Sequence, residues 1–153
     1  MNDFMKEAIK EVKKGIKNNE GGPFGAVVVK NGKIIGRGHN KVVKDNDPTA
    51  HAEMVAIREA CKNINSFSLK GCEIYTTCEP CPMCFSAIHW ARLDKVYYGA
   101  SKETAAKIGF DDKFIYDILE GKIEDNIKFI QIDIKDTQTV CNEWSEKEDK
   151  ILY

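Results

Sequence analysis

The chain has 153 residues, of which 42% are hydrophobic and 31% charged, and its formal net charge is −1. This length and composition suit one compact domain, and the chain has neither a low-complexity tract nor a block of like charge that would predict long disorder. The segment from Asp117 to Tyr153 contains ten acidic residues and five lysines. Its net negative charge makes it a poor binding surface for nucleic acid, because phosphate groups bind basic patches. We therefore expect a single domain over residues 1–153 that binds no nucleic acid.

The N-terminal segment, MNDFMKEAIKEVKKG, carries apolar residues at helical spacing with lysines between them. This pattern predicts an amphipathic helix and differs from the continuous apolar stretch of a signal peptide. No run of eighteen apolar residues occurs, so no membrane partner is expected. The six cysteines of a chain without a secretory signal favour metal ligands or buried thiols over disulfides. The expected location is cytoplasmic.

Predicted strands and helices follow in a regular order. Asn31-Gly32 is the turn signal of a tight hairpin between two β-branched runs, so two antiparallel strands open the sheet. Strands and helices then alternate, which implies right-handed crossovers and pairing that is at least partly parallel. The strands are expected at residues 24–30, 33–40, 72–77, 95–99 and 127–132, and the later helices at 50–62, 81–92 and 137–150. The expected fold is a three-layer α/β/α sandwich around a mixed five-stranded sheet.

The segment CEPCPMC predicts part of a metal site. Cys81 and Cys84 are separated by three positions, so they share one face of a helical turn and can bind the same ion. Pro80 suits a helix start, and a helix N-terminus favours thiolates. His51 stands at another helix start, and the first residues of two βα turns can meet beyond the strand ends. His51, Cys81 and Cys84 are therefore the predicted ligands of a zinc ion.

Glu53 lies two residues after His51, in an open first turn where both side chains can face an object ahead of the helix. Three protein ligands leave a tetrahedral zinc one open position, which is typical of a catalytic site. Water held there has its pKa lowered from about 15.7 toward ~7, and Glu53 could accept its proton as a general acid/base. The alternative is a structural zinc site with Cys78 as the fourth ligand, which leaves Glu53 without a role.

The pattern His51-Ala52-Glu53 followed by Pro80-Cys81-Pro82-Met83-Cys84 resembles the H-x-E…P-C-x-x-C signature of the zinc-dependent cytidine/deoxycytidylate deaminase superfamily. The resemblance runs from about residue 5 to the last residue and fits the bacterial guanine deaminases best. It implies a cytidine deaminase-like fold with one zinc ion per subunit. It also implies the hydrolysis of the purine base guanine to xanthine and ammonia by a homodimer. The stretches that carry the resemblance are residues 21–26, 46–53, 78–92 and 109–116.

The resemblance also assigns residues to substrate binding. It implies that Asp112 accepts N–H bonds from guanine, that Asn40 recognises the base, and that Phe24 and Trp90 lie beside it. From the residues alone, Asp111 and Asp112 could both be helix caps and Asn40 an ordinary strand end. Phe24 and Trp90 could equally belong to the core.

Two further positions complete the predicted pocket. Ala52, inside the His-x-Glu motif, is assigned to substrate binding. Tyr153 is expected to close the site, because the guanine deaminases place a terminal aromatic residue there and exchange their C-terminal segments between two subunits. A frayed terminus is the alternative from the residues alone. His39 is assigned no role beyond ending a strand.

Other activities share the zinc signature. A tRNA adenosine deaminase would match much of the first hundred residues, but it is expected to carry a basic face, and the acidic C-terminal segment lacks one. Deamination of cytosine, cytidine or an aminated triazine ring also remains open. A zinc-binding module without catalysis is the alternative of a different class.

Overall fold

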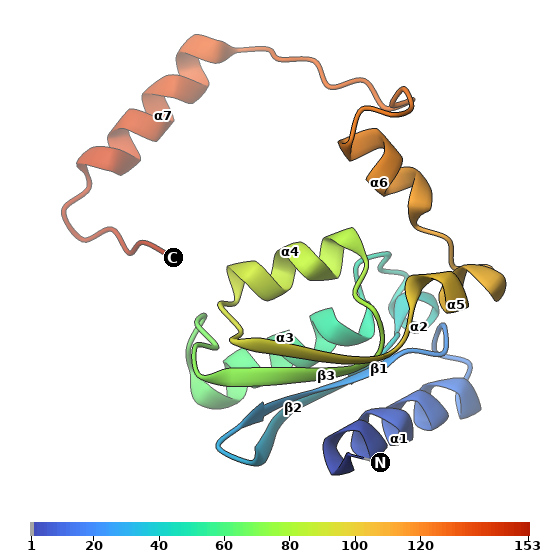
Figure 1. Ribbon diagram of the computed structural model, residues 1–153. Coiled ribbons are helices and arrows are strands. Elements are labelled where there is room, and N and C mark those ends of the chain that lie inside the picture. The colour runs from blue at the N-terminus through green and yellow to red at the C-terminus, as the bar shows by residue number, and fades with distance from the viewer. Residues whose placement is uncertain (1) are drawn as a thin grey trace.

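The computed structural model describes residues 2–153, which form helices around one sheet (Figure 1). The strands are β1 (Gly25–Lys30), β2 (Lys33–His39), β3 (Cys72–Cys78) and β4 (Lys95–Ala100). The helices are α1 (Asp3–Lys17), α2 (Val42–Asp45), α3 (Ala52–Ile64), α4 (Pro82–Trp90), α5 (Lys102–Lys107), α6 (Lys113–Leu119) and α7 (Ile134–Glu146).

The sheet has the strand order β2-β1-β3-β4. The β1–β2 hairpin is antiparallel, β1 and β3 are antiparallel, and β3 and β4 are parallel. The predicted opening hairpin and the mixed sheet are therefore confirmed. The parallel pair follows from the α4 crossover, which returns the chain to the same end of the sheet before β4 begins.

Helices cover both faces of the sheet. The amphipathic helix α1 begins at Asn2, whose side chain accepts the Phe4 amide at 2.9 Å and so caps the first turn. It packs on one face, while α3 and α4 pack on the other (Figure 1). The α1 face buries Ala8, Val27, Val29 and Tyr75, and the α3 and α4 face buries Ala26, Val28, Ala56, Ile74 and Ile88.

Two glycines of β2 let α3 approach the sheet closely. A Cβ atom on Gly36 would lie 2.3 Å from the Ala56 carbonyl oxygen, and one on Gly38 would lie 2.3 Å from that of Ala52. Neither contact is possible for a larger residue without a shift of the helix. These glycines therefore fix the height of α3, and with it the position of its first turn at the carboxyl end of the sheet.

The predicted fifth strand is wrong. Residues 127–132 form no strand, and the described sheet has four strands. Their alternation of apolar and polar residues is typical of a strand, but a strand also needs a neighbouring edge to bond with. In this chain the segment lies away from the free edge of β4, and Phe129 is 88% exposed.

The C-terminal segment, residues 126–153, departs from the compact part of the molecule. Every residue from 126 to 153 is exposed, and Figure 1 shows α7 apart from the sheet, joined to α6 by an extended segment. The last helix begins at Ile134 and ends at Glu146, earlier at both ends than the predicted 137–150. Among the described helices, none is long and apolar enough to cross a membrane.

Candidate functional site

Three side chains from two helix starts converge at the carboxyl end of β3. His51 and Cys81 are the N-cap residues of α3 and α4, and Cys84 lies in the first turn of α4. The Nδ1 atom of His51 lies 3.5 Å from the Sγ of Cys81 and 3.6 Å from the Sγ of Cys84. All three donor atoms fall within 4.8 Å of one another, and two sulfurs with one imidazole nitrogen suit zinc.

The pKa values of the two thiols in this cluster are shifted in opposite directions. A hydrogen bond from the Cys84 thiol, helped by His51, lowers the pKa of Cys81 to about 4. The Cys81 thiolate and burial together raise the pKa of Cys84 far above its usual range. A dication would offset the repulsion between two thiolates, so the chemistry of these donors fits a bound metal.

Glu53 is a buried carboxyl group beside the ligand cluster. It lies in the first turn of α3, only 6% exposed, and its side chain lines the same cavity as His51 and Cys81. Burial, followed by the negative charge of Cys81, raises the pKa of this carboxyl group. Its position beside the ligands, and outside their group of three, suits a group that exchanges protons with a substrate.

Cys78 lies outside the ligand cluster. Its Sγ points to the Ser101 carbonyl oxygen at 3.8 Å, and the residue lines the cavity. Among the described residues the group that could hold a metal therefore has three members, His51, Cys81 and Cys84. This arrangement favours a site with an open position over one closed by Cys78.

The ligand cluster opens into a cavity of about 640 Å³. This volume lies in the range of small-molecule sites, about 300–1,000 Å³. Three of the predicted substrate residues, Phe24, Asn40 and Asp112, line this cavity together with Glu53. They come from the start of β1, the end of β2 and the start of α6, so the fold brings together residues up to 88 positions apart in the chain.

Asn40 and Asp112 offer opposite hydrogen-bonding groups to the cavity. The Oδ1 of Asn40 accepts the Val42 amide at 3.1 Å, and among the described residues its Nδ2 has no acceptor. The Asp112 side chain makes no capping bond, and burial, followed by the charge of Cys81, raises its pKa. Asp111 instead accepts the Lys113 amide at 2.9 Å, as a capping residue does.

An aromatic pair forms one wall of the cavity. Phe110 packs edge-on against Phe24, with ring centroids 4.9 Å apart, and a Cβ atom on Gly22 would lie 2.9 Å from the Phe110 ring. Sequence reasoning assigned no role to Phe110, although the stretch 109–116 that contains it was singled out. Val42 and Val43 also line the cavity and carried no signal in the sequence.

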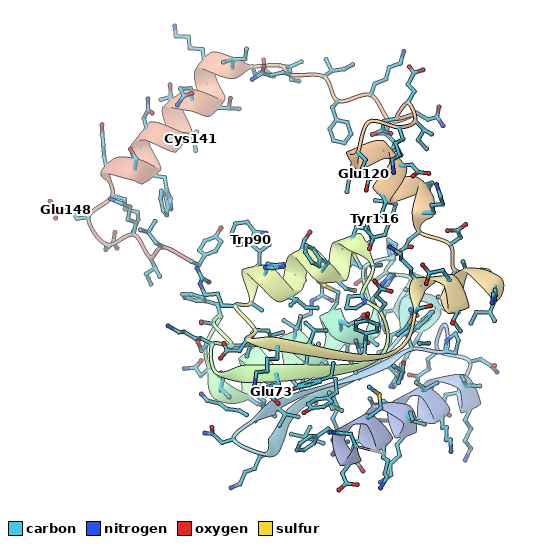
Figure 2. The ribbon with its side chains drawn as sticks, in the orientation of Figure 1. Glu73, Trp90, Tyr116, Glu120, Cys141 and Glu148 are labelled. Atoms are coloured by element: carbon cyan, nitrogen blue, oxygen red, sulfur yellow. The ribbon has the colours of Figure 1, made fainter. Side chains whose placement is uncertain are left out.

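Three predicted substrate residues lie elsewhere. Ala52 is fully buried beneath β2, outside the cavity lining. Trp90 is 66% exposed at the end of α4, on the outer side of that helix (Figure 2). The Tyr153 ring lies 6.3 Å from the rings of both Trp90 and Phe67, measured between centroids. Within one chain, Trp90 and Tyr153 thus meet each other and not the cavity.

Comparison with known proteins identifies the family. The family described as "Cytidine and deoxycytidylate deaminase zinc-binding region" matches residues 1–100, which include His51, Glu53, Cys81 and Cys84. The chain belongs to this deaminase family. The resemblance seen in the sequence is thereby confirmed, and the chain has the cytidine deaminase-like fold, with a sheet of four strands among the described residues.

Individual relatives of the deaminase differ in how much of it they match. Guanine deaminase of Bacillus subtilis is 45% identical over 98% of this chain and 97% of its own length, and its X-ray structure matches with a TM-score of 0.93. A tRNA-specific adenosine deaminase of Aquifex aeolicus is 48% identical over 63% of this chain and 64% of its own. A protein solved with 2,6-diaminopurine is 33% identical over 71% of this chain and 61% of its own, with a TM-score of 0.68.

Proposed function

We propose that this deaminase hydrolyses guanine to xanthine and ammonia. The observation that carries the proposal is the extent of similarity: the guanine deaminase matches 98% of the chain, whereas the tRNA deaminase matches 63%. The residues that follow the zinc-binding region include Asp112 and Phe110, which line the cavity. The substrate pocket thus depends on a part of the chain that the zinc signature does not cover.

The cavity offers groups complementary to guanine. Asp112 provides an acceptor for the N–H donors of the base, and the free Nδ2 of Asn40 provides donors for acceptors such as O6 or N7. Phe24 and Phe110 supply an aromatic wall for a flat ring. A solved relative that binds 2,6-diaminopurine supports a purine base as the ligand class.

His51, Cys81 and Cys84 would hold one zinc ion in each chain. Bound there, zinc acts as a Lewis acid and lowers the pKa of a water ligand to about 7. The remaining chemistry falls to Glu53. It takes a proton from the attacking water and gives it to N3 of the ring as C2 is attacked. It then moves the second proton from the new hydroxyl group at C2 to the amino nitrogen, so ammonia leaves and C2 becomes a carbonyl carbon.

Turnover of a panel of substrates tests the proposal. The zinc-loaded protein is expected to convert guanine to xanthine and ammonia, with adenine, cytosine and cytidine at least about 100-fold slower, because a site built to bond a polar edge rejects bases that lack it. Xanthine is followed by its absorbance and ammonia by a coupled assay. A tRNA anticodon hairpin is included because of the similarity to tRNA deaminases. Turnover of the hairpin alone would refute the proposal.

We further propose that the active form is a homodimer whose C-terminal segments are exchanged. The support lies in the exposed apolar residues of this segment, because large apolar surface is normally covered in an assembly. Ile127, Phe129 and Ile130 are 70%, 88% and 76% exposed. Exchange would bring Tyr153 of one chain to the cavity of the other and let it close over the base.

A complementation experiment tests the exchange. Glu53→Gln removes the proton carrier, and Tyr153→Ala removes the closing ring from the other chain's site. Each variant alone is expected to be at least about 10-fold less active than the wild type, because Glu53 carries the protons of the reaction and Tyr153 closes the site over the base. About half of randomly formed dimers contain one chain of each variant, and each of these mixed dimers holds one complete site out of two. Co-expression should therefore restore about a quarter of the wild-type activity. A mixture with no more activity than its components, or a monomeric mass in light scattering, would overturn the exchange.

A further inference from the structure

A chain of charged groups, three of them largely buried, lies outside both the metal site and the cavity lining. The His39 imidazole at the end of β2 contacts two carboxylates: its Nδ1 lies 3.0 Å from the Oε2 of Glu11, and its Nε2 bonds the Oε2 of Glu20. The other oxygen of Glu20 accepts the Lys44 ammonium at 2.9 Å. The His39 side chain is 3% exposed, whereas that of Lys44 reaches solvent. We call these four residues the His39 network.

The hydrogen-bond pattern of the His39 network indicates the charge that each of its members carries. An ionised carboxylate can only accept and a neutral imidazole has a single N–H, so with Glu11 and Glu20 both ionised the two contacts are hydrogen bonds only when the ring is doubly protonated. Two carboxylates, one imidazolium and one ammonium then balance, which makes burial of the charges tolerable. The bonds from His39 and then Lys44 lower the pKa of Glu20 to about 2, so this carboxylate stays ionised at neutral pH.

Helix α1 is shaped around the imidazole. Gly15 lies in the last turns of α1, and a Cβ atom there would lie 2.8 Å from Cδ2 of His39. A glycine inside a helix costs roughly 0.5–1 kcal/mol relative to alanine. That cost has a packing reason here, because only glycine leaves room for the ring between α1 and β2.

The His39 network is tied by backbone bonds to the wall of the cavity. The Lys44 amide donates to the Glu20 carbonyl oxygen at 3.0 Å, so Glu20 holds α2 through both its side chain and its backbone. Asn40 follows His39 directly, and its amide donates to the Phe24 carbonyl oxygen at 3.0 Å. A Cβ atom on Gly21, next to Glu20, would lie 2.1 Å from the Asn40 Oδ1. The Glu20 loop and the Asn40 side chain therefore cannot move independently.

We propose that the His39 network is the positioning device of the nucleobase pocket, in which the bond from His39 to Glu20 holds Asn40 in place to bind the substrate. This inference rests on the proposed function, because the base that Asn40 would contact is the proposed substrate. His39 and Glu20 are positioning residues: neither lines the cavity, and each acts through Asn40 and α2.

Two replacements of His39 separate its two bonds. In His39→Gln the side-chain amide occupies the place of Nε2 and can still donate to Glu20. In His39→Asn it occupies the place of Nδ1 and can donate only to Glu11. The matched control is Glu7→Gln, which breaks a 2.7 Å ion pair with Arg37 that also joins α1 to β2, two residues before His39 along the strand.

The measurements are KM and kcat for guanine, together with amide hydrogen exchange of residues 40–44 in zinc-loaded protein without substrate. His39→Asn is expected to raise KM about 10-fold, the magnitude of one lost hydrogen bond in a buried site, while kcat stays within about 3-fold of wild type. His39→Gln and Glu7→Gln are expected to keep KM within about 3-fold of wild type. Exchange in residues 40–44 should accelerate in His39→Asn only.

Each other outcome overturns the positioning role. Equal losses in His39→Asn and His39→Gln, or in Glu7→Gln, would make the His39 network a general tie between α1 and β2. A fall in kcat at constant KM would place its effect on the chemical step. If the wild type deaminates no guanine, the proposed function fails. The amide hydrogen exchange of residues 40–44 in the variants then decides by itself whether the bond from His39 to Glu20 holds Asn40.

Discussion

Replacing Glu53 by glutamine is expected to lower kcat for guanine by roughly 10³-fold, within the 10²–10⁴-fold range of general acid/base catalysis. Glutamine keeps the size of the side chain but cannot carry a proton between water, N3 and the leaving amine. Zinc content should stay at one ion per chain, because Glu53 is not among the three donors of the cluster. The measurements are steady-state kinetics and metal analysis of the same preparation.

Stability and a matched variant complete this test. Glu53 is a buried carboxyl group, so loss of its ionisable oxygen is expected to leave Tm unchanged or higher. The control Glu59→Gln alters a carboxylate of the same helix whose oxygen accepts the Arg37 amide, outside the cavity. It should keep wild-type kinetics. A Glu53→Gln variant with zinc and more than about a tenth of wild-type kcat would show that another group moves the protons.

The convergence of His51, Cys81 and Cys84 was predictable from the sequence because its geometry is local. Cys81 and Cys84 share one helical turn, and His51 opens a second helix after β2 and a connection that contains α2, so spacing and element order already place the three donors at one end of the sheet. The opening hairpin and the parallel β3–β4 pair followed from Asn31-Gly32 and from the crossover order for the same reason.

What could not be predicted depends on partners distant in the chain or outside it. The alternation in residues 127–132 indicates a strand, but local pattern does not say whether an edge is within reach. Trp90 and Tyr153 meet each other within the chain, and the proposed exchange would bring Tyr153 to a cavity only in a second copy. His39 resembled an ordinary strand end because its partners are distant in the sequence: Glu11 lies in α1, and Glu20 lies in the loop before β1.

Replacing Cys84 by serine is expected to weaken zinc binding by more than ~100-fold, since even the loss of a group that supports a ligand costs about 10–100-fold in affinity. The purified variant should contain little zinc and show no turnover. Cys78→Ser is the matched variant, because Cys78 also lines the cavity but lies outside the donor group, with its thiol facing the Ser101 carbonyl oxygen. It should keep one zinc ion per chain, measured by metal analysis and by competition with a chelator.

The comparison between these two variants decides what kind of zinc site the chain contains. Three protein ligands leave a position for water, which a hydrolase needs, whereas a fourth thiolate would close it. If Cys78→Ser lost zinc as readily as Cys84→Ser, the site would be closed, and Glu53 would have no water to deprotonate. Retention of zinc in Cys78→Ser, with its loss in Cys84→Ser, leaves the buried carboxyl group of Glu53 beside an open coordination position. In that arrangement burial disfavours the charged form of the Glu53 carboxyl group and raises its pKa, which suits a group that both takes and gives a proton during the reaction.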